Sequence, residues 1–236
     1  MTMRICIDTN LFLGLYWSDE DVREVFGDIE MLKRSLLVPD MISDEFLRNR
    51  DRILDSQSRQ MRRTEIDDLH PPFLVRQQQG FSTLRERSDD YNTALQSLVA
   101  GIREMIADPQ KDPLYVSFSG LIDDPAVTVI RRTEEHVERA HRRKLLGNPP
   151  KSERKDTIGD EVIWEMILGQ ADGDLLLITR DATYRNHITF LTAEYAEKTG
   201  HRLTIDGNIS TALRAIGKEP SEPLLRFESR QTEAGE

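Results

Sequence analysis

The stretch "ICIDTNLFLG", residues 5–14, places an acidic side chain directly after a short apolar run. Residues 5–7 are all apolar, which is typical of a strand that is buried on both faces. Asp8 ends this predicted strand, and Thr9 and Asn10 follow it. Because a buried carboxylate is costly unless its charge is compensated, this stretch predicts a functional site at the end of the first strand.

Three further acids stand at comparable places along the chain. Glu45 follows a second predicted strand, "SLLVPDMIS" at 35–43, and lies in the first turn of the next helix. Asp160 opens a helix that precedes the most strand-like stretch, "DLLLIT" at 174–179, and Asp181 follows that stretch. Strands that alternate with helices in this way indicate an α/β fold with a central parallel sheet flanked by helices.

The carboxyl ends of parallel strands meet at one edge of a sheet, which is where ligands bind. The four acids Asp8, Glu45, Asp160 and Asp181 are therefore expected to converge there. Converging carboxylates repel each other, and hard divalent cations with oxygen ligands are the usual counter-charge. We expect one or two Mg²⁺ or Mn²⁺ ions, with Thr9, Asn10 and Thr179 orienting the ligands.

These motifs resemble those of PIN-domain nucleases. "ICIDTNLFLG", "LLVPDMISDEF", "TIGDEVIWEMIL" and "LLLITRDATY" are similar, in order, to the four acidic motifs of that family. The segment "RRKLLGNPPKSERKDTIGD" looks like a bacterial PIN-like subfamily with a long helical insertion. The resemblance implies a three-layer PIN-like fold in which the four acids bind the metal. It also implies hydrolysis of single-stranded RNA by a metal-activated water, leaving a 5′-phosphate.

The predicted organisation is a single nuclease domain over residues 1–217. A large helical insertion is expected at about 70–130, where no motif is recognised. Residues 218–236 contain two prolines and few apolar side chains, which predicts a mostly flexible tail.

Each acid also has a plainer explanation. Asp8 could form an Asx turn, and Glu45 could complement a helix dipole, with Asp40 and Asp44 as rival ligands. Asp160 could be only an N-cap, and "TRD" at Asp181 could be a simple turn.

Basic residues gather in one segment of an otherwise acidic chain. The net charge is −10, yet residues 131–155 contain nine basic and four acidic side chains. A solvated helix face is the default interpretation of such a run. The functional alternative is a track for the phosphates of a nucleic acid. Its candidates are Arg139, Arg143, Lys151, Arg154 and Lys155.

The composition limits the cellular compartments and the binding partners that are expected for this protein. No apolar run approaches the ~20 residues that span a bilayer, and "MTMRICID" lacks the apolar stretch of a signal peptide. Cys6 is the only cysteine, which suits a reducing cytoplasm. By resemblance, the partners expected are RNA, a second copy in a homodimer, and an antitoxin or other regulatory protein, with a toxin or defence role.

Two other functions are weighed beside the nuclease. A haloacid-dehalogenase-type phosphatase also places an aspartate after its first strand, but here Asn10 occupies the position of its second acid. A catalytically inactive PIN-like scaffold is the second alternative. Four clustered acids argue against it, because a scaffold gains nothing from carboxylates that repel one another.

Overall fold

The computed structural model describes all residues except 1–2, 68–69, 152–156, 171 and 234–236. The chain divides into two compact units: unit 1 comprises Met1–Arg48 and Ser117–Glu236, and unit 2 comprises Asn49–Val116. The sequence predicts the helical insertion at about 70–130, so the second unit begins and ends earlier than expected. The reason lies in residues 40–62, which contain no proline or glycine and form one unbroken helix across residue 49.

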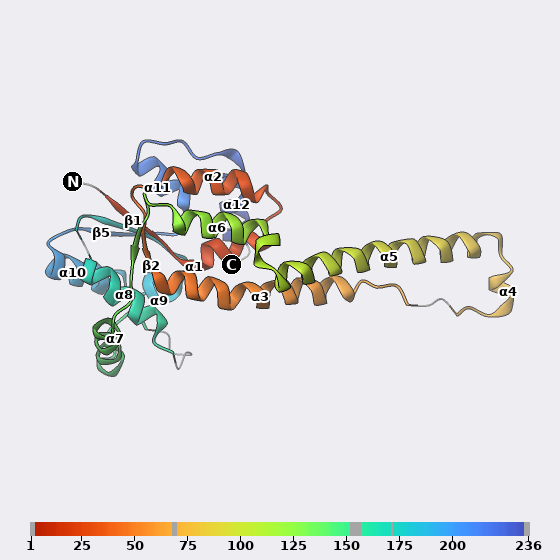
Figure 1. The fold of residues 1–236 in the computed structure, drawn as a ribbon, viewed down its shortest axis with the longest axis horizontal. Helices are drawn as coiled ribbons and strands as arrows, with labels where there is room; N and C mark the ends of the chain where they lie inside the picture. The colour runs from red at the N-terminus through yellow and green to blue at the C-terminus, as the bar shows by residue number, and fades with distance from the viewer. Residues whose placement is uncertain (1–2, 68–69, 152–156, 171, 234–236) are drawn as a thin grey trace. The chain divides into compact units, whose positions relative to one another are not determined.

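Three parallel strands form the central sheet of unit 1, as the sequence predicts. Their order is β1-β4-β5, and every residue of β4 is buried. Ile7, Ile178 and Asp206 are aligned in register at the carboxyl ends of the three strands. Figure 1 shows α11 on one side of this sheet and α8 on the other, which gives three layers. The strands are β1 (Arg4–Ile7), β4 (Leu175–Ile178) and β5 (Leu203–Asp206).

A second parallel pair extends this arrangement. β2 (Leu37–Pro39) pairs with β3 (Thr128–Ile130), and a single bridge from Leu36 to Ile5 links the pair to β1. The second strand expected from the sequence ends at Pro39, as predicted, and α3 begins at once with Asp40. β3 is not predicted from the sequence, since three residues are too few to show a period.

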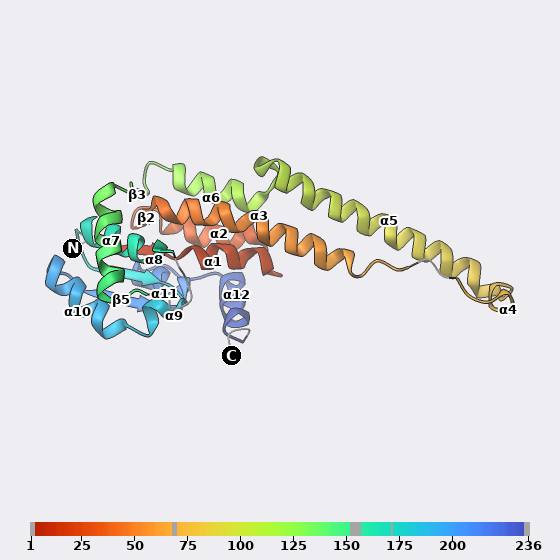
Figure 2. The ribbon, with the colours of Figure 1, turned by 90° about the horizontal axis from the view of Figure 1, so that it is seen from below.

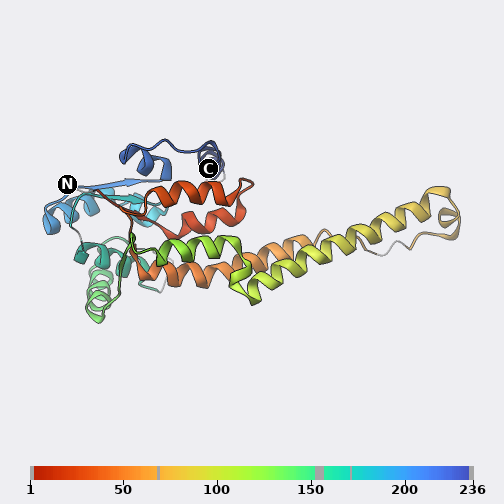
Figure 3. The same cartoon turned by 45° about the horizontal axis from the view of Figure 1, so that its top comes forward.

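Helices make up most of unit 1. Three phenylalanine rings join α1, α3 and α6: Phe118 contacts Phe12 at 5.1 Å and stacks on Phe46 at 4.0 Å. Figure 3 shows these helices side by side. The helices are α1 (Thr9–Gly14), η1 (Leu15–Trp17), α2 (Val22–Met31), α7 (Glu134–Leu146), α8 (Gly159–Gln170), α9 (Ala182–Arg185), α10 (Ile188–Thr199), α11 (Ile209–Ala215), α12 (Glu222–Glu233), and parts of α3 (Asp40–Arg62) and α6 (Pro113–Asp123).

The segment expected to be a flexible tail contains an ordered helix. α12 buries Leu224 and Phe227, which lie three residues apart on one face. Arg226 donates to Glu20 at 2.9 Å, and Ser221 donates to Asp28 at 2.7 Å. The two apolar positions and these polar contacts hold α12 against the domain, although the sequence around them is mostly polar.

Unit 2 is a pair of long antiparallel helices. The second half of α3 leads through α4 (Phe73–Arg76) to α5 (Gln79–Ala107), which runs back alongside α3 (Figures 1 and 2). η2 (Pro109–Lys111) and the start of α6 follow. At this end of the helix pair, the buried side chain of Arg50 donates to the buried carboxylate of Asp112 at 2.7 Å. This contact joins α3 to the segment that precedes α6. Within the described residues, no helix combines the length and apolar character needed to cross a bilayer.

Candidate active site

Asp8 lies at the carboxyl edge of the central sheet. Its backbone N–H donates to the carbonyl of Ile178 at 2.9 Å, so the β1–β4 ladder extends as far as Asp8. Thr179, the next residue of the neighbouring strand, donates its hydroxyl to the Asp8 carboxylate at 2.6 Å. This contact fixes the Asp8 side chain at the point where two strands end. The side chain of Asn10 is exposed.

Glu45 reaches the same edge from the first turns of α3. The hydroxyl of Thr9, the residue after Asp8, donates to Glu45 at 3.0 Å. The rival acids are held elsewhere: Asp40 accepts from the backbone of Arg132 at 3.0 Å, and Asp44 forms an ion pair with the Arg132 side chain at 3.2 Å. The hydrogen bonds therefore favour Glu45 over its two neighbours.

Hydrogen bonds through the Thr179 hydroxyl link Asp181 to Asp8. The backbone N–H of Asp181 donates to Oγ1 of Thr179, which in turn donates to Asp8. The Asp181 carboxylate caps α9 by accepting from the backbone and hydroxyl of Thr183 at 2.8 and 2.9 Å. Thr179 thus positions two of the four acids at once.

Asp160 lies in the first turn of α8, and Tyr184 connects it to this group. The Tyr184 hydroxyl donates to the backbone carbonyl of Asp160 at 3.3 Å, and the ring is buried. Burial first, and then the charges of Asp160, Asp8 and Asp181, raise the pKa of Tyr184. Tyr184 is not among the site residues predicted from the sequence, where its position three residues after Asp181 is a weak signal.

The acids influence one another's ionisation. Burial, followed by the negative charges of Glu45 and Asp181, raises the pKa of Asp8 to about 6. The Thr179 hydroxyl and the backbone of Asn10 act in the opposite direction. The charges of Glu45 and Asp181 thus oppose the ionisation of Asp8, and a cation bound at this edge would weaken that repulsion.

The donor set has the chemistry of a Mg²⁺ or Mn²⁺ site, since all four predicted ligands are carboxylates. Within the described residues, however, no group of three or more His, Cys, Asp or Glu side chains is gathered closely enough to hold an ion. The acids are close enough to repel, yet they do not form a finished ligand shell. A hard cation that keeps several water ligands suits such a loose group.

Comparison with known proteins identifies the family. A family model described as PIN domain matches residues 5–184. The chain belongs to the PIN-domain family. No curated protein and no solved structure matches the chain. PIN domains are generally metal-dependent nucleases, so the family supports nuclease activity and a nucleic-acid substrate in general terms.

The charge of the half-buried Asp8 carries a stability cost in this PIN domain. Replacing Asp8 by Asn keeps an acceptor for Thr179 and removes the charge. We expect Asp8→Asn to stabilise the metal-free protein at pH 7.5 by about 1–2 kcal/mol, because one pKa unit corresponds to about 1.4 kcal/mol and Asp8 keeps partial access to water. Thermal unfolding in EDTA measures this as a rise in Tm of roughly 2–8 °C.

The pH dependence of this difference is the control. The folded-state pKa of Asp8 lies above the ordinary value, so the penalty is absent below about pH 4 and complete above about pH 6. The two proteins should therefore differ least at pH 4, and the gap should grow up to about pH 6 and then stay constant. A difference in Tm that does not change between pH 4 and 7.5 would contradict this origin.

Thr179 gives a second prediction for the PIN domain. Thr179→Val keeps the shape of the side chain but removes the hydroxyl that contacts both Asp8 and Asp181. Loss of a group that orients metal ligands typically costs 10–100-fold in affinity or activity. We expect the nuclease activity of Thr179→Val to fall by about that factor. Thr204→Val, at an exposed position of β5, is the matched control and should cleave as the wild type does.

Arg143 does not match the phosphate-binding role expected from the sequence. Only 3% of its side chain is exposed, and it lies between Glu165 and Glu194, each at 2.7 Å. Burial alone would raise the pKa of Glu194, but the hydrogen bonds from Arg143 and Trp164 hold that pKa below its ordinary value. Arg143 is thus neutralised by two carboxylates inside the domain, and we exclude it from the candidate substrate contacts.

The other basic candidates have varied positions. Arg139 is half-exposed and forms an ion pair with Glu135, one turn away in α7. Lys151 is exposed. Arg154 and Lys155 lie outside the described residues.

Proposed function

We propose that this PIN domain is a metal-dependent endoribonuclease that cleaves single-stranded RNA. Asp8, Glu45, Asp160 and Asp181 would hold one or two Mg²⁺ or Mn²⁺ ions. The observation that carries the proposal is the set of hydrogen bonds at the carboxyl edge of the sheet, in which Thr179 contacts both Asp8 and Asp181 and Thr9 contacts Glu45. The family membership of the chain supports the same chemistry.

The roles of the residues follow from their contacts. A bound ion supplies an activated water and neutralises charge on the scissile phosphate. Asp8 is held by Thr179, and Glu45 is held by Thr9, so both carboxylates keep a fixed direction toward the edge of the sheet. Water attacks phosphorus, the P–O3′ bond breaks, and the products carry a 5′-phosphate and a 3′-hydroxyl.

The test uses one labelled sequence as single-stranded RNA, as duplex RNA and as single-stranded DNA. We expect cleavage of the single-stranded RNA with Mn²⁺ or Mg²⁺, no cleavage with EDTA, and 5′-phosphate ends on the products. Cleavage that persists in EDTA, or products that end in a 2′,3′-cyclic phosphate, would contradict the proposal.

An inactive PIN scaffold is the second candidate, and the loose arrangement of the acids favours it. A scaffold would show neither cleavage nor binding of Mn²⁺. Titration of the protein with Mn²⁺ in the absence of RNA therefore distinguishes the two proposals.

A further inference from the structure

The part of α3 that belongs to unit 2 is basic, although the chain as a whole is acidic. Residues 50–63 contain five arginines and two aspartates, a net charge of +3. Because the whole chain carries −10, the other residues together carry −13. A polyanion is repelled by such a chain as a whole and attracted where cations gather on its surface. The position of these arginines on α3 decides whether they form such a surface.

Three of these arginines lie in a row along one side of the helix. Arg52, Arg59 and Arg63 follow each other at intervals of seven and four residues, which places them on the same face. The backbone N–H of Arg63 donates to the carbonyl of Arg59 at 3.3 Å, so the last turn of the helix includes Arg63. All three side chains are exposed. At 1.5 Å per residue, this arginine row is about 16 Å long.

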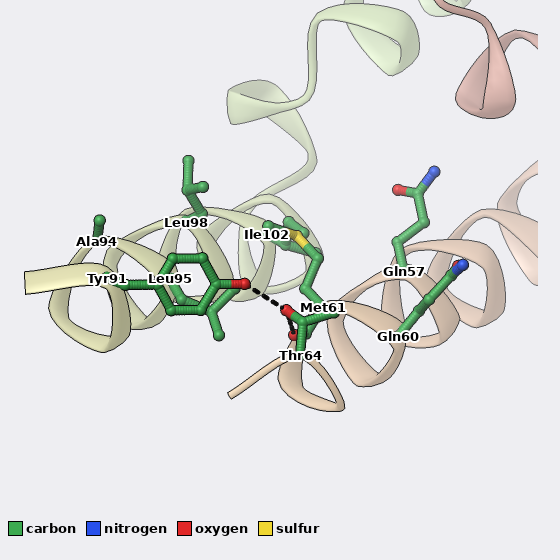
Figure 4. Close-up of a pocket in the computed structure, with 9 residues that line it drawn as sticks. All are labelled: Gln57, Gln60, Met61, Thr64, Tyr91, Ala94, Leu95, Leu98 and Ile102. Atoms are coloured by element: carbon green, nitrogen blue, oxygen red, sulfur yellow. Dashed lines mark hydrogen bonds between the residues drawn. The ribbon is translucent and has the colours of Figure 1, made fainter. Parts of the chain in front are cut away.

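The opposite side of α3 is the one that packs in unit 2. Leu54 and Ser58, four residues apart, are both buried. Met61 continues this side and projects toward Ile102 of α5, where the two helices line a hollow of about 530 Å³ (Figure 4). Packing against α5 therefore uses the side of α3 that carries no arginine of the row, and the row stays in water.

Acids compensate only part of the charge in the arginine row. Asp55 forms an ion pair with Arg59, one turn away. Arg52 donates to the neutral side chain of Asn49 at 3.4 Å. Within the part of the chain that the structure describes, no carboxylate forms an ion pair with Arg52 or Arg63. A hollow of about 460 Å³ follows the row and is lined by Arg52, Asp55, Ser56, Arg59, Gln60 and Arg63.

We propose that the arginine row binds phosphates of the single-stranded RNA substrate. The identity of this ligand rests on the proposed function. Guanidinium groups suit the task, because their planar N–H donors match phosphate oxygens. Ser56 and Gln60 add neutral donors of the kinds that contact phosphates in nucleic-acid complexes. Phosphate contacts carry no sequence information, so binding at the row should not depend on the base sequence.

The composition of the row favours RNA over an acidic protein. The core of a protein interface is enriched in aromatic side chains and methionine, which leave water on binding. The hollow along the row is lined only by arginine, aspartate, serine and glutamine side chains. It therefore lacks the apolar side chains that such a core needs. Phosphate binding needs none, because the attraction is electrostatic.

The candidate active site needs a cationic surface of this kind. Its predicted ligands are carboxylates, which repel a phosphate until a metal ion is bound. In the basic segment of unit 1, Arg143 is neutralised by two buried carboxylates, and Arg139 is paired with Glu135. The arginine row supplies an attraction for RNA that does not depend on the metal ion.

Binding of RNA to the full-length protein in EDTA tests the row apart from cleavage. Fluorescence anisotropy of a labelled single-stranded RNA gives the affinity over a range of salt concentrations. Each phosphate contact with a single strand contributes about 0.7 to the slope of log affinity against log salt. For the triple variant Arg52→Gln, Arg59→Gln, Arg63→Gln, we expect a slope smaller by about 2 and an affinity at least about ten-fold lower at 0.1 M salt. The corresponding triple substitution by lysine keeps the charges and should keep the slope.

The matched control removes three exposed cations from unit 1, with Arg34→Gln, Arg214→Gln and Lys218→Gln in one chain. It changes the net charge equally and should leave the slope as in the wild type. Circular dichroism should show that both triple variants are folded. An equal loss of affinity in the control, or an unchanged affinity and slope in the variant of the row, would overturn the inference. The second of these results is also the one expected if the row binds an acidic protein instead.

The two proposals fail in different ways in this experiment. If the wild type cleaves RNA with Mn²⁺ but the variant of the row binds RNA equally well, the inference is wrong and the proposed function stands. If the wild type binds RNA through the row but does not cleave it with Mn²⁺, the proposed function is wrong and the inference stands. A wild type that binds no RNA in EDTA would overturn the inference as well.

Discussion

Asp8→Asn should abolish RNA cleavage while leaving the protein folded. Asp8 lies at the point where β1 and β4 end, and its carboxylate accepts the Thr179 hydroxyl at 2.6 Å. Replacing groups that merely orient a metal ligand costs roughly 10–100-fold, so loss of a ligand itself should cost at least about 100-fold. The rate of cleavage of a labelled single-stranded RNA, measured at saturating Mn²⁺, gives the factor directly.

The control for this variant is Asp44→Asn. Asp44 is adjacent to Glu45 in the sequence, but its carboxylate is paired with Arg132 at the protein surface. It should cleave RNA within about two-fold of the wild type, since an exposed ion pair contributes little. If Asp8→Asn retained full activity, Asp8 would not be a ligand. Equal losses in both variants would instead indicate a general effect of negative charge.

Arg143→Ala should destabilise unit 1 by about 3–5 kcal/mol. The substitution leaves Glu165 and Glu194 without their shared cation inside the domain, and breaking a buried ion pair has a cost of this size. Urea denaturation followed by circular dichroism measures the change in the free energy of unfolding. The variant should still cleave RNA at low temperature, where the folded form persists.

Arg139→Ala is the matched control on the same helix. Arg139 forms an exposed ion pair one turn from Glu135, so its loss should change the free energy of unfolding by at most about 0.5 kcal/mol. If Arg143→Ala left the free energy of unfolding unchanged but strongly reduced the affinity for RNA, the structural role of Arg143 would be contradicted.

The sheet and its edge could be predicted because their signals are local. A fully apolar strand followed by an acid is visible in residues 5–8 and again in 175–181. Parallel pairing then brings Asp8 and Thr179 together without any further information. The PIN-like fold and the nearness of Asp8 to Asp181 follow from these two stretches.

The misassigned features depend on contacts between distant residues. Arg143 belongs to a basic segment, and its partner Glu194 is fifty-one residues away, so the sequence gives no sign that the charge is buried. α12 is anchored by Leu224 and Phe227 among polar neighbours, and its docking sites lie in other elements.

Binding of Mn²⁺ to the protein without RNA tests the central claim most directly. Isothermal titration calorimetry should detect binding to the wild type. Asp8→Asn, Glu45→Gln, Asp160→Asn and Asp181→Asn should each weaken binding at least about ten-fold, while Asp44→Asn should not. A wild type that binds no Mn²⁺, or four variants that bind as the wild type does, would contradict the proposal that these carboxylates share an ion.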